Sequence, residues 1–137
     1  MDAKTYKENA VQTDLMDYGP VRQRLAYVGT MRLLHAAMGL CTESGEFMDM
    51  MKKHILYGKP IDNTNLKEEL GDLEWYIALA IDELNTTFGL VFETNINKLR
   101  ARYPNKFTEH DALSRDLSKE REILEAADGK SGTEEGN

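Results

Sequence analysis

The sequence is short of the residues that mark several classes of protein. It contains one cysteine and three prolines among 137 residues, and it has no long apolar run. A single cysteine excludes an internal disulfide and fits a reducing compartment. The missing apolar run argues against a membrane span or a signal peptide. Few prolines and few β-branched runs favour helices. We therefore expect a cytoplasmic, all-α protein with a single domain.

Basic residues are also scarce relative to acidic ones. The chain has 17 Lys and Arg against 24 Asp and Glu, which gives a net charge of −7 and a pI near 5.0. This balance argues against a nucleic acid or an anionic membrane as the main partner. A negatively charged substrate would therefore need local cations or metal ions to be held.

Apolar residues recur at steps of three and four along most of the chain, and this pattern predicts a helical bundle of four to five helices. The expected helices cover residues 3–16, 31–56, 63–85, 91–103 and 109–126. The region 21–30 is either a turn or a short helix. Residues 1–126 are expected to form one domain, and residues 127–137 are expected to form a disordered tail because Gly, Ser, Lys and Glu dominate there.

Two of these helices carry apolar stripes that predict their buried faces. In 31–56 the stripe includes Leu33, Ala37, Leu40, Ser44, Phe47, Met51 and Ile55, and in 63–85 it includes Leu66, Leu70, Leu73, Ile77, Ala80 and Leu84. The second helix is apolar outside this stripe too, at Trp75, Tyr76 and Leu79. A helix that is apolar on more than one side is usually buried on more than one side. We therefore expect at least a dimer, with oligomerisation through the bundle helices.

The most informative feature is a pair of acidic motifs, Glu43-Ser44-Gly45-Glu46 and Glu69-Leu70-Gly71-Asp72. Residues three apart share a helix face, so each motif presents two carboxylates together. Gly58 and the proline that follows break the pattern between them. Glu46 lies 12 residues before Gly58 and Glu69 lies 11 after it. At the rise of an α-helix both lie roughly 17–18 Å from the bend. A helical hairpin would bring the four carboxylates to one place.

Oxygen ligands alone select Mg²⁺, Mn²⁺ or Ca²⁺ over zinc or copper. Mg²⁺ in proteins is usually shared between carboxylates and substrate phosphates, which points to a phosphorylated substrate. A carboxylate that holds no metal could act as the general base. The glycines inside the motifs, Gly45 and Gly71, cost helix stability, so they indicate a close helix approach, room for metal and water, or both.

Cationic and aromatic residues elsewhere provide candidate substrate contacts. Asn95, Lys98 and Arg102 share a face of the 91–103 helix, from which the two cations could neutralise phosphate oxygens. Lys53, in the Lys52–His54 segment, either assists them or complements the helix dipole. Tyr57 and Trp75 are either packing residues or platforms on which a base stacks.

Taken together, these motifs resemble the MazG-like all-α nucleotide pyrophosphohydrolases. The two acidic motifs match the Glu-x-x-Glu and Glu-x-x-Asp of that family, and the segments "KKHILYGKP", "LKEELGDLEWYIAL" and "NINKLRARYPNKF" match closely as well. The resemblance extends from about Leu34 to Glu125. It implies a Mg²⁺-dependent hydrolase, with Mn²⁺ as a possible substitute, that splits a nucleoside triphosphate between the α and β phosphates. It also implies a helical bundle that works as a dimer or tetramer.

The resemblance assigns roles by position. The metal ligands would be Glu43, Glu46, Glu69 and Asp72, and substrate would bind Asn95, Lys98 and Arg102. From the residues themselves we also expect Lys53 among the substrate contacts, and we expect the catalytic residues to be Glu46, Glu69 and Lys98. Asn97 is an alternative to Asn95. A different interpretation is a non-catalytic bundle that binds nucleotides or proteins. A redox di-metal protein is a third, which the absence of Glu-x-x-His pairs disfavours.

Overall fold

The computed structural model describes residues 1–15 and 17–128, and every regular element in that part of the chain is a helix. The helices are α1 (Ala3–Gln12), α2 (Gly19–Leu25), α3 (Val28–Tyr57), α4 (Asn63–Glu83), α5 (Phe88–Arg102), α6 (Glu109–Leu113) and α7 (Leu117–Asp128). The all-α prediction is confirmed. Among the described residues, no helix is long and apolar enough to cross a membrane.

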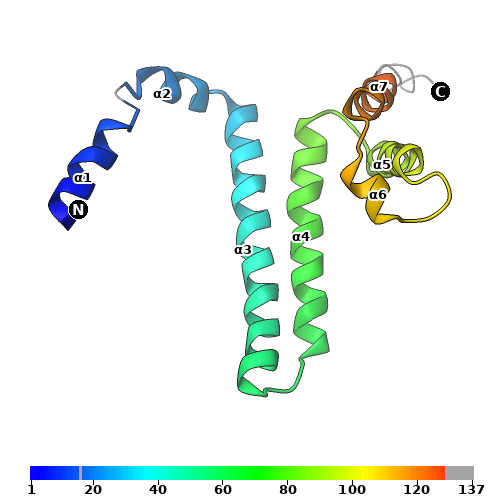
Figure 1. Cartoon of the computed structure of the whole chain (residues 1–137), viewed down its shortest axis with the longest axis horizontal. Helices are drawn as coiled ribbons and strands as arrows, with labels where there is room; N and C mark the ends of the chain where they lie inside the picture. The colour runs from blue at the N-terminus through cyan, green and yellow to red at the C-terminus, as the bar shows by residue number, and fades with distance from the viewer. Residues whose placement is uncertain (16, 129–137) are drawn as a thin grey trace.

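The centre of the fold is a hairpin of the two longest helices, α3 and α4, which lie antiparallel and side by side (Figure 1). Gly58 ends α3 in the left-handed conformation at φ 65°, and its N–H donates to the His54 carbonyl. Glycine adopts this conformation without the steric cost that a Cβ brings. Asp62 then caps α4, because its side chain accepts from the backbone N–H groups of Thr64 and Asn65. The predicted turn between the acidic motifs is therefore present.

The two helices pack closely at Gly39, far from that turn. The ring of Tyr76 occupies the space where a Cβ on Gly39 would lie, at 2.2 Å. Nearby Ala36 is only 1% exposed. Gly45 and Gly71 play no such part, because a Cβ on either would meet no atom within 4 Å. The expectation of a close helix approach at the motif glycines is therefore wrong. The open space beside them fits the other expectation, which was room for metal and water.

The predicted apolar stripes are only partly buried. Ile55, Leu70 and Leu84 are 70%, 52% and 61% exposed, respectively. The reason is geometric, since a two-helix hairpin has one contact face and leaves the other apolar sides uncovered. A compact monomer of 15.6 kDa exposes about 7,000 Å², whereas this chain exposes 11259 Å².

The C-terminal helices form a second packing unit, in which α7 lies against α5 (Figure 1). The prediction of one helix over 109–126 is wrong, because the segment is divided between α6 and α7. Polar side chains start both pieces. Thr108 Oγ1 accepts from the N–H of Asp111 at 3.0 Å, and Asp116 Oδ1 accepts from the N–H of Lys119 at 3.0 Å. Residues 127 and 128 belong to α7, and the rest of the predicted tail lies outside the described residues.

The N-terminal helices differ in extent from the prediction. The helix α1 ends at Gln12, because Thr13 closes it with a backbone bond to the Ala10 carbonyl. The ambiguous segment 21–30 contains most of α2 and the first turn of α3, with Pro20 in the first turn of α2, where its missing N–H costs nothing. Only α2 of this pair packs against the hairpin, and α1 lies apart from it (Figure 1).

Candidate metal centre

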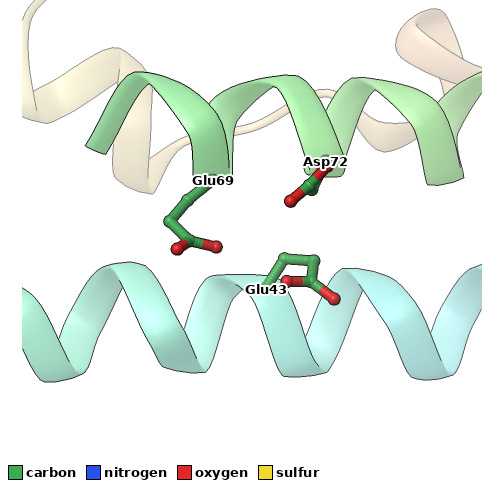
Figure 2. A group of neighbouring side chains, drawn as sticks. All are labelled: Glu43, Glu69 and Asp72. Atoms are coloured by element: carbon green, nitrogen blue, oxygen red, sulfur yellow. The ribbon is translucent and has the colours of Figure 1, made fainter. Parts of the chain in front are cut away.

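Three of the four predicted carboxylates meet between α3 and α4. One carboxylate oxygen from each of Glu43, Glu69 and Asp72 lies within 4.8 Å of the others. Figure 2 shows Glu43 rising from α3 and Glu69 and Asp72 descending from α4 into the space between the helices. The two motifs lie at nearly equal distances from the turn, 12 and 11 residues, and so reach about the same height, as the sequence predicted.

Glu69 is the buried member of the group, at 5% exposed. Asn65, one turn earlier on α4, donates from Nδ2 to Glu69 Oε1 at 3.3 Å and to the sulfur of Met50 at 3.2 Å. Burial raises the pKa of the Glu69 carboxyl, and the neighbouring charges of Glu46, Glu43 and Asp72 raise it further. Among residues 1–15 and 17–128, Glu69 forms no ion pair, so the negative charge around it is not balanced there.

Glu46 belongs to the same site but stands to one side of the three-carboxylate group. It lines an open groove of about 500 Å³ together with Glu69, Asp49, Lys53 and other residues of α3 and α4. Lys53 is the cation at this groove, and its ammonium lies 2.6 Å from Asp49 Oδ2. Lys52 pairs with the same aspartate. The hairpin thus presents a carboxylate cluster with a partly neutralised lysine on its rim.

The predicted contacts of α5 are not brought to this cluster within one chain. Arg102 instead forks the carboxylate of Glu120 on α7, with Nε to Oε1 at 2.8 Å and Nη2 to Oε2 at 2.6 Å. Asn95 lines a separate hollow of about 630 Å³ between the end of α4, α5 and α7. Lys98 is half-buried on α5, and Asn97, the alternative to Asn95, lines a hollow against α7.

The groove also contains residues that the sequence pattern did not single out. Asn65, Met50 and Asp49 line it, and Asn65 contacts the buried carboxylate directly. The signal was present in the spacing, because Asn65 precedes Glu69 by four residues and Asp49 precedes Lys53 by four. Polar residues at that spacing from an acidic motif share its helix face.

The donor set fits a hard divalent cation. The converging atoms are carboxylate oxygens, and no histidine or cysteine joins the group among residues 1–15 and 17–128. Such a set suits Mg²⁺, Mn²⁺ or Ca²⁺ better than zinc or copper. The raised pKa of Glu69 supports the same reading, because a bound cation would relieve the charge crowding that disfavours its ionised form.

Comparison with known proteins identifies a family. The MazG nucleotide pyrophosphohydrolase domain matches residues 33–107, which is more than half of the chain and contains both acidic motifs. The Gene 37 protein of Mycobacterium phage L5 is 36% identical over 75 residues. That alignment covers 51% of this chain and 65% of the phage protein, slightly less than two thirds of its length. No solved structure gave a significant match.

Proposed function

Because the chain belongs to the MazG nucleotide pyrophosphohydrolase family, we propose that it is a Mg²⁺-dependent enzyme that cleaves nucleoside triphosphates between the α and β phosphates. The products are a nucleoside monophosphate and pyrophosphate. The observation that carries the proposal is the convergence of Glu43, Glu69 and Asp72 on one spot between α3 and α4. The role that fits such chemistry is removal of unwanted or excess nucleotides from the cytoplasmic pool.

The position of each carboxylate in the hairpin suggests its role. Glu43, Glu69 and Asp72 would hold Mg²⁺, which would supply positive charge to phosphate oxygens and make water more acidic. Glu46 faces the open groove, so it is placed to accept a proton from an attacking water. Asn65 holds one oxygen of Glu69 and leaves the other for the cluster. Lys53 stands on the rim, where phosphate oxygens would replace Asp49 as its partner.

A second copy of the chain completes this site in our proposal. The exposed area exceeds that of a compact monomer by far more than the 1,200–2,000 Å² that a stable interface buries. In a homodimer or homotetramer, α5 of one copy would face the groove of another and deliver Lys98 and Asn95. Arg102 would follow only if it left Glu120.

The direct test is product analysis. The full chain is incubated with canonical and modified nucleoside triphosphates, with and without Mg²⁺, and the products are separated by chromatography. Monophosphate and pyrophosphate that form only with metal support the proposal, and Glu46→Gln and Asp72→Asn should abolish them while the circular dichroism spectrum stays unchanged. Diphosphate and orthophosphate would reject cleavage at the α–β bond. No product from any nucleotide would favour the non-catalytic binding module.

The shared site has its own test. Glu46→Gln and Lys98→Ala variants, each inactive alone, should regain activity when they are unfolded and refolded together. Mixed oligomers would then contain one intact site assembled from two chains. Light scattering on the unmutated chain measures the oligomer directly. A monomer in solution, or no recovery on mixing, would contradict the contribution of a second copy.

A further inference from the structure

A second hollow, which we call the turn hollow, lies at the turn of the hairpin. It has a volume of about 270 Å³ and is lined by residues from the end of α3, the turn and the start of α4, including Met50, Met51, Lys53, Lys59, Ile61 and Leu66. Figure 1 shows that this end of the hairpin points away from the other helices. Pockets for drug-sized molecules have volumes of about 300–1,000 Å³, so the turn hollow suits a smaller ligand.

Hydrogen bonds hold the loop beside the turn hollow in place. The N–H of Lys59 donates to the Lys53 carbonyl at 3.3 Å, and His54 Nδ1 donates to the Lys59 carbonyl at 2.7 Å. Asp62 Oδ1 accepts two backbone N–H groups at the start of α4, at 3.0 and 3.1 Å. The loop is therefore ordered before any ligand arrives, which lowers the entropy cost of binding.

The walls of the turn hollow are largely apolar. Met50 and Met51 come from α3, Leu66 comes from α4, and Ile61 comes from the loop between them. Ile61 is 42% exposed, so solvent reaches part of this surface. Removing apolar area from water is favourable, and a ligand with an apolar body would gain by covering these walls.

Two lysines also line the turn hollow, and they differ in their partners. The ammonium of Lys53 lies 2.6 Å from Asp49 Oδ2. Lys59 forms no ion pair within residues 1–15 and 17–128. The acid that lines the turn hollow, Asp62, is already engaged by the N–H groups of α4. An anion could therefore neutralise Lys59 without first breaking another ion pair.

The turn hollow and the acidic groove share one wall, because Met50, Lys53 and Asn65 line both. Asn65 donates from Nδ2 to the Met50 sulfur at 3.2 Å and to Glu69 Oε1 at 3.3 Å. Lys53 reaches Asp49, which lines the groove. A ligand that moves this wall would therefore change the surroundings of the carboxylates behind it.

We propose that the turn hollow binds a small amphipathic anion, and that its occupation strengthens cation binding in the acidic groove. The apolar body covers the methionine and leucine walls, and the anionic group pairs with Lys59 and draws Lys53 away from Asp49. The released carboxylate of Asp49 then adds negative charge to the groove. A small inorganic anion would leave the apolar walls in water, and an organic cation would meet two ammonium groups. The inference does not depend on turnover of any nucleotide.

Methionine methyl groups provide the first test, because Met50 and Met51 line the turn hollow and the chain has seven methionines in all. The full chain with ¹³C-methyl methionine is titrated with benzenesulfonate in EDTA and followed by NMR. The signals of Met50 and Met51 should shift to saturation, whereas those of the exposed Met31, Met38 and Met48 should stay in place. No shift at the first pair, or equal shifts at all five, would overturn the site.

Matched ligands separate the two parts of the recognition. Methanesulfonate keeps the charge and lacks the ring, so it should bind about ten-fold more weakly or worse. Benzyltrimethylammonium keeps the ring and reverses the charge, and it should cause no shift. Equal affinity of this cation would reject an anion site. Benzoate and phenyl phosphate should bind in EDTA, and the tighter of the two identifies the anionic group; binding of neither would contradict the proposal.

Two variants place the ligand. Lys59→Ala should weaken benzenesulfonate binding by about three-fold or more. Ile61→Glu should weaken it by about ten-fold or more, because it removes apolar surface and adds a like charge. The matched controls are Lys67→Ala, an exposed lysine of α4, and Ile61→Leu, and both should bind normally. Circular dichroism confirms that each variant is folded, and unchanged affinity in both test variants would reject the site.

Calorimetry then tests the coupling. The full chain is titrated with Mn²⁺ with and without saturating benzenesulfonate, an anion that binds divalent metals weakly. Mn²⁺ affinity should rise by about three-fold or more with the ligand present, and Mn²⁺ should raise benzenesulfonate affinity by the same factor. Asp49→Asn should abolish this coupling and keep the shifts of Met50 and Met51. Unchanged or weaker Mn²⁺ affinity, or coupling that persists in Asp49→Asn, would overturn the proposed link.

Discussion

Two glutamates are buried in this chain to almost the same degree, and their surroundings are opposite. Glu69 is 5% exposed on α4 and Glu120 is 6% exposed on α7. Other carboxylates surround Glu69, and its pKa is raised. Glu120 accepts hydrogen bonds from Arg102 and Arg115, which lower its pKa to about 2. Burial is the same in the two places, so the partners alone decide the direction of the shift.

The difference distinguishes a candidate ligand site around Glu69 from a completed ion-pair contact around Glu120. Around Glu120 each charge meets its opposite inside the chain, and the result joins α5 to α7. Around Glu69 like charges are kept close at a cost to the folded state, which a bound cation or protonation of Glu69 would offset. A buried acid that lacks an oppositely charged partner is thus a better indicator of a binding site than a buried acid as such.

The largest expected effect comes from neutralising Glu69. Glu69→Gln should lower kcat/KM for the proposed reaction by about 100-fold or more, because it removes a metal ligand. The same change should raise the melting temperature of the metal-free chain, because it removes charge crowding. Steady-state kinetics and thermal denaturation in EDTA measure the two effects. Glu74→Gln, an exposed neighbour on α4, is the control, and unchanged activity in Glu69→Gln would remove this residue from the site.

The same substitution at Glu120 should have the opposite effect on stability. Glu120→Gln leaves two arginines without their charged partner, so the melting temperature should fall by about 5 °C or more. Amide exchange should increase in α7 and leave α3 and α4 unaffected, because α7 packs on α5. Glu122→Gln changes an exposed acid of the same helix and should have little effect. Loss of metal binding in Glu120→Gln would instead show that the two regions are coupled.

Acid should act in opposite directions on the two regions. The pKa of Glu120 is lowered from 4.5 to about 2, so its contribution is complete above 4.5 and is lost as the pH falls toward 2. The pKa of Glu69 is raised, so its ionised form disfavours folding at neutral pH, and acid relieves that penalty before it reaches 4.5. Amide exchange of the metal-free chain at several pH values should show α7 loosening below pH 4.5 while the hairpin tightens between neutral pH and 4.5. If α7 and the hairpin instead loosened together as the pH falls, the opposite pKa shifts of Glu120 and Glu69 would be contradicted.

The smallest expected effects come from glycine substitutions, which change the packing of the two helices without changing charge. Gly71→Ala should stabilise α4 by about 1 kcal/mol, because an added Cβ meets nothing within 4 Å. Gly39→Ala should destabilise the hairpin, since its Cβ would lie 2.2 Å from the Tyr76 ring. Denaturant unfolding of the metal-free chain measures both. Equal effects in the two variants would mean that the helices do not pack as described.

The sequence predicted the hairpin and its acidic cluster because both follow from local rules. Helical periodicity, the glycine at the turn and the i,i+3 spacing act over a few residues, and equal distances from Gly58 align Glu46 and Glu69. The contacts of Arg102 were not predictable in this way. Its partner Glu120 lies 18 residues further along the chain, beyond a break at Ser114 to Asp116 that helical periodicity does not show. Exposure of Ile55 and Leu70 was missed because apolar spacing identifies a face but not what covers it.

The turn at Gly58 also limits how this chain can change in length. The two acidic motifs meet because 12 residues on one side of the turn are matched by 11 on the other. A deletion of one residue between Glu46 and the turn would rotate Glu43 and Glu46 by about 100° around α3 and carry them out of register with α4. The loop from Lys59 to Ile61 carries no such constraint. Insertions should therefore be tolerated in that loop, and within the helices only when both arms gain the same number of whole turns, about seven residues each, so that the motifs keep both their height and their facing.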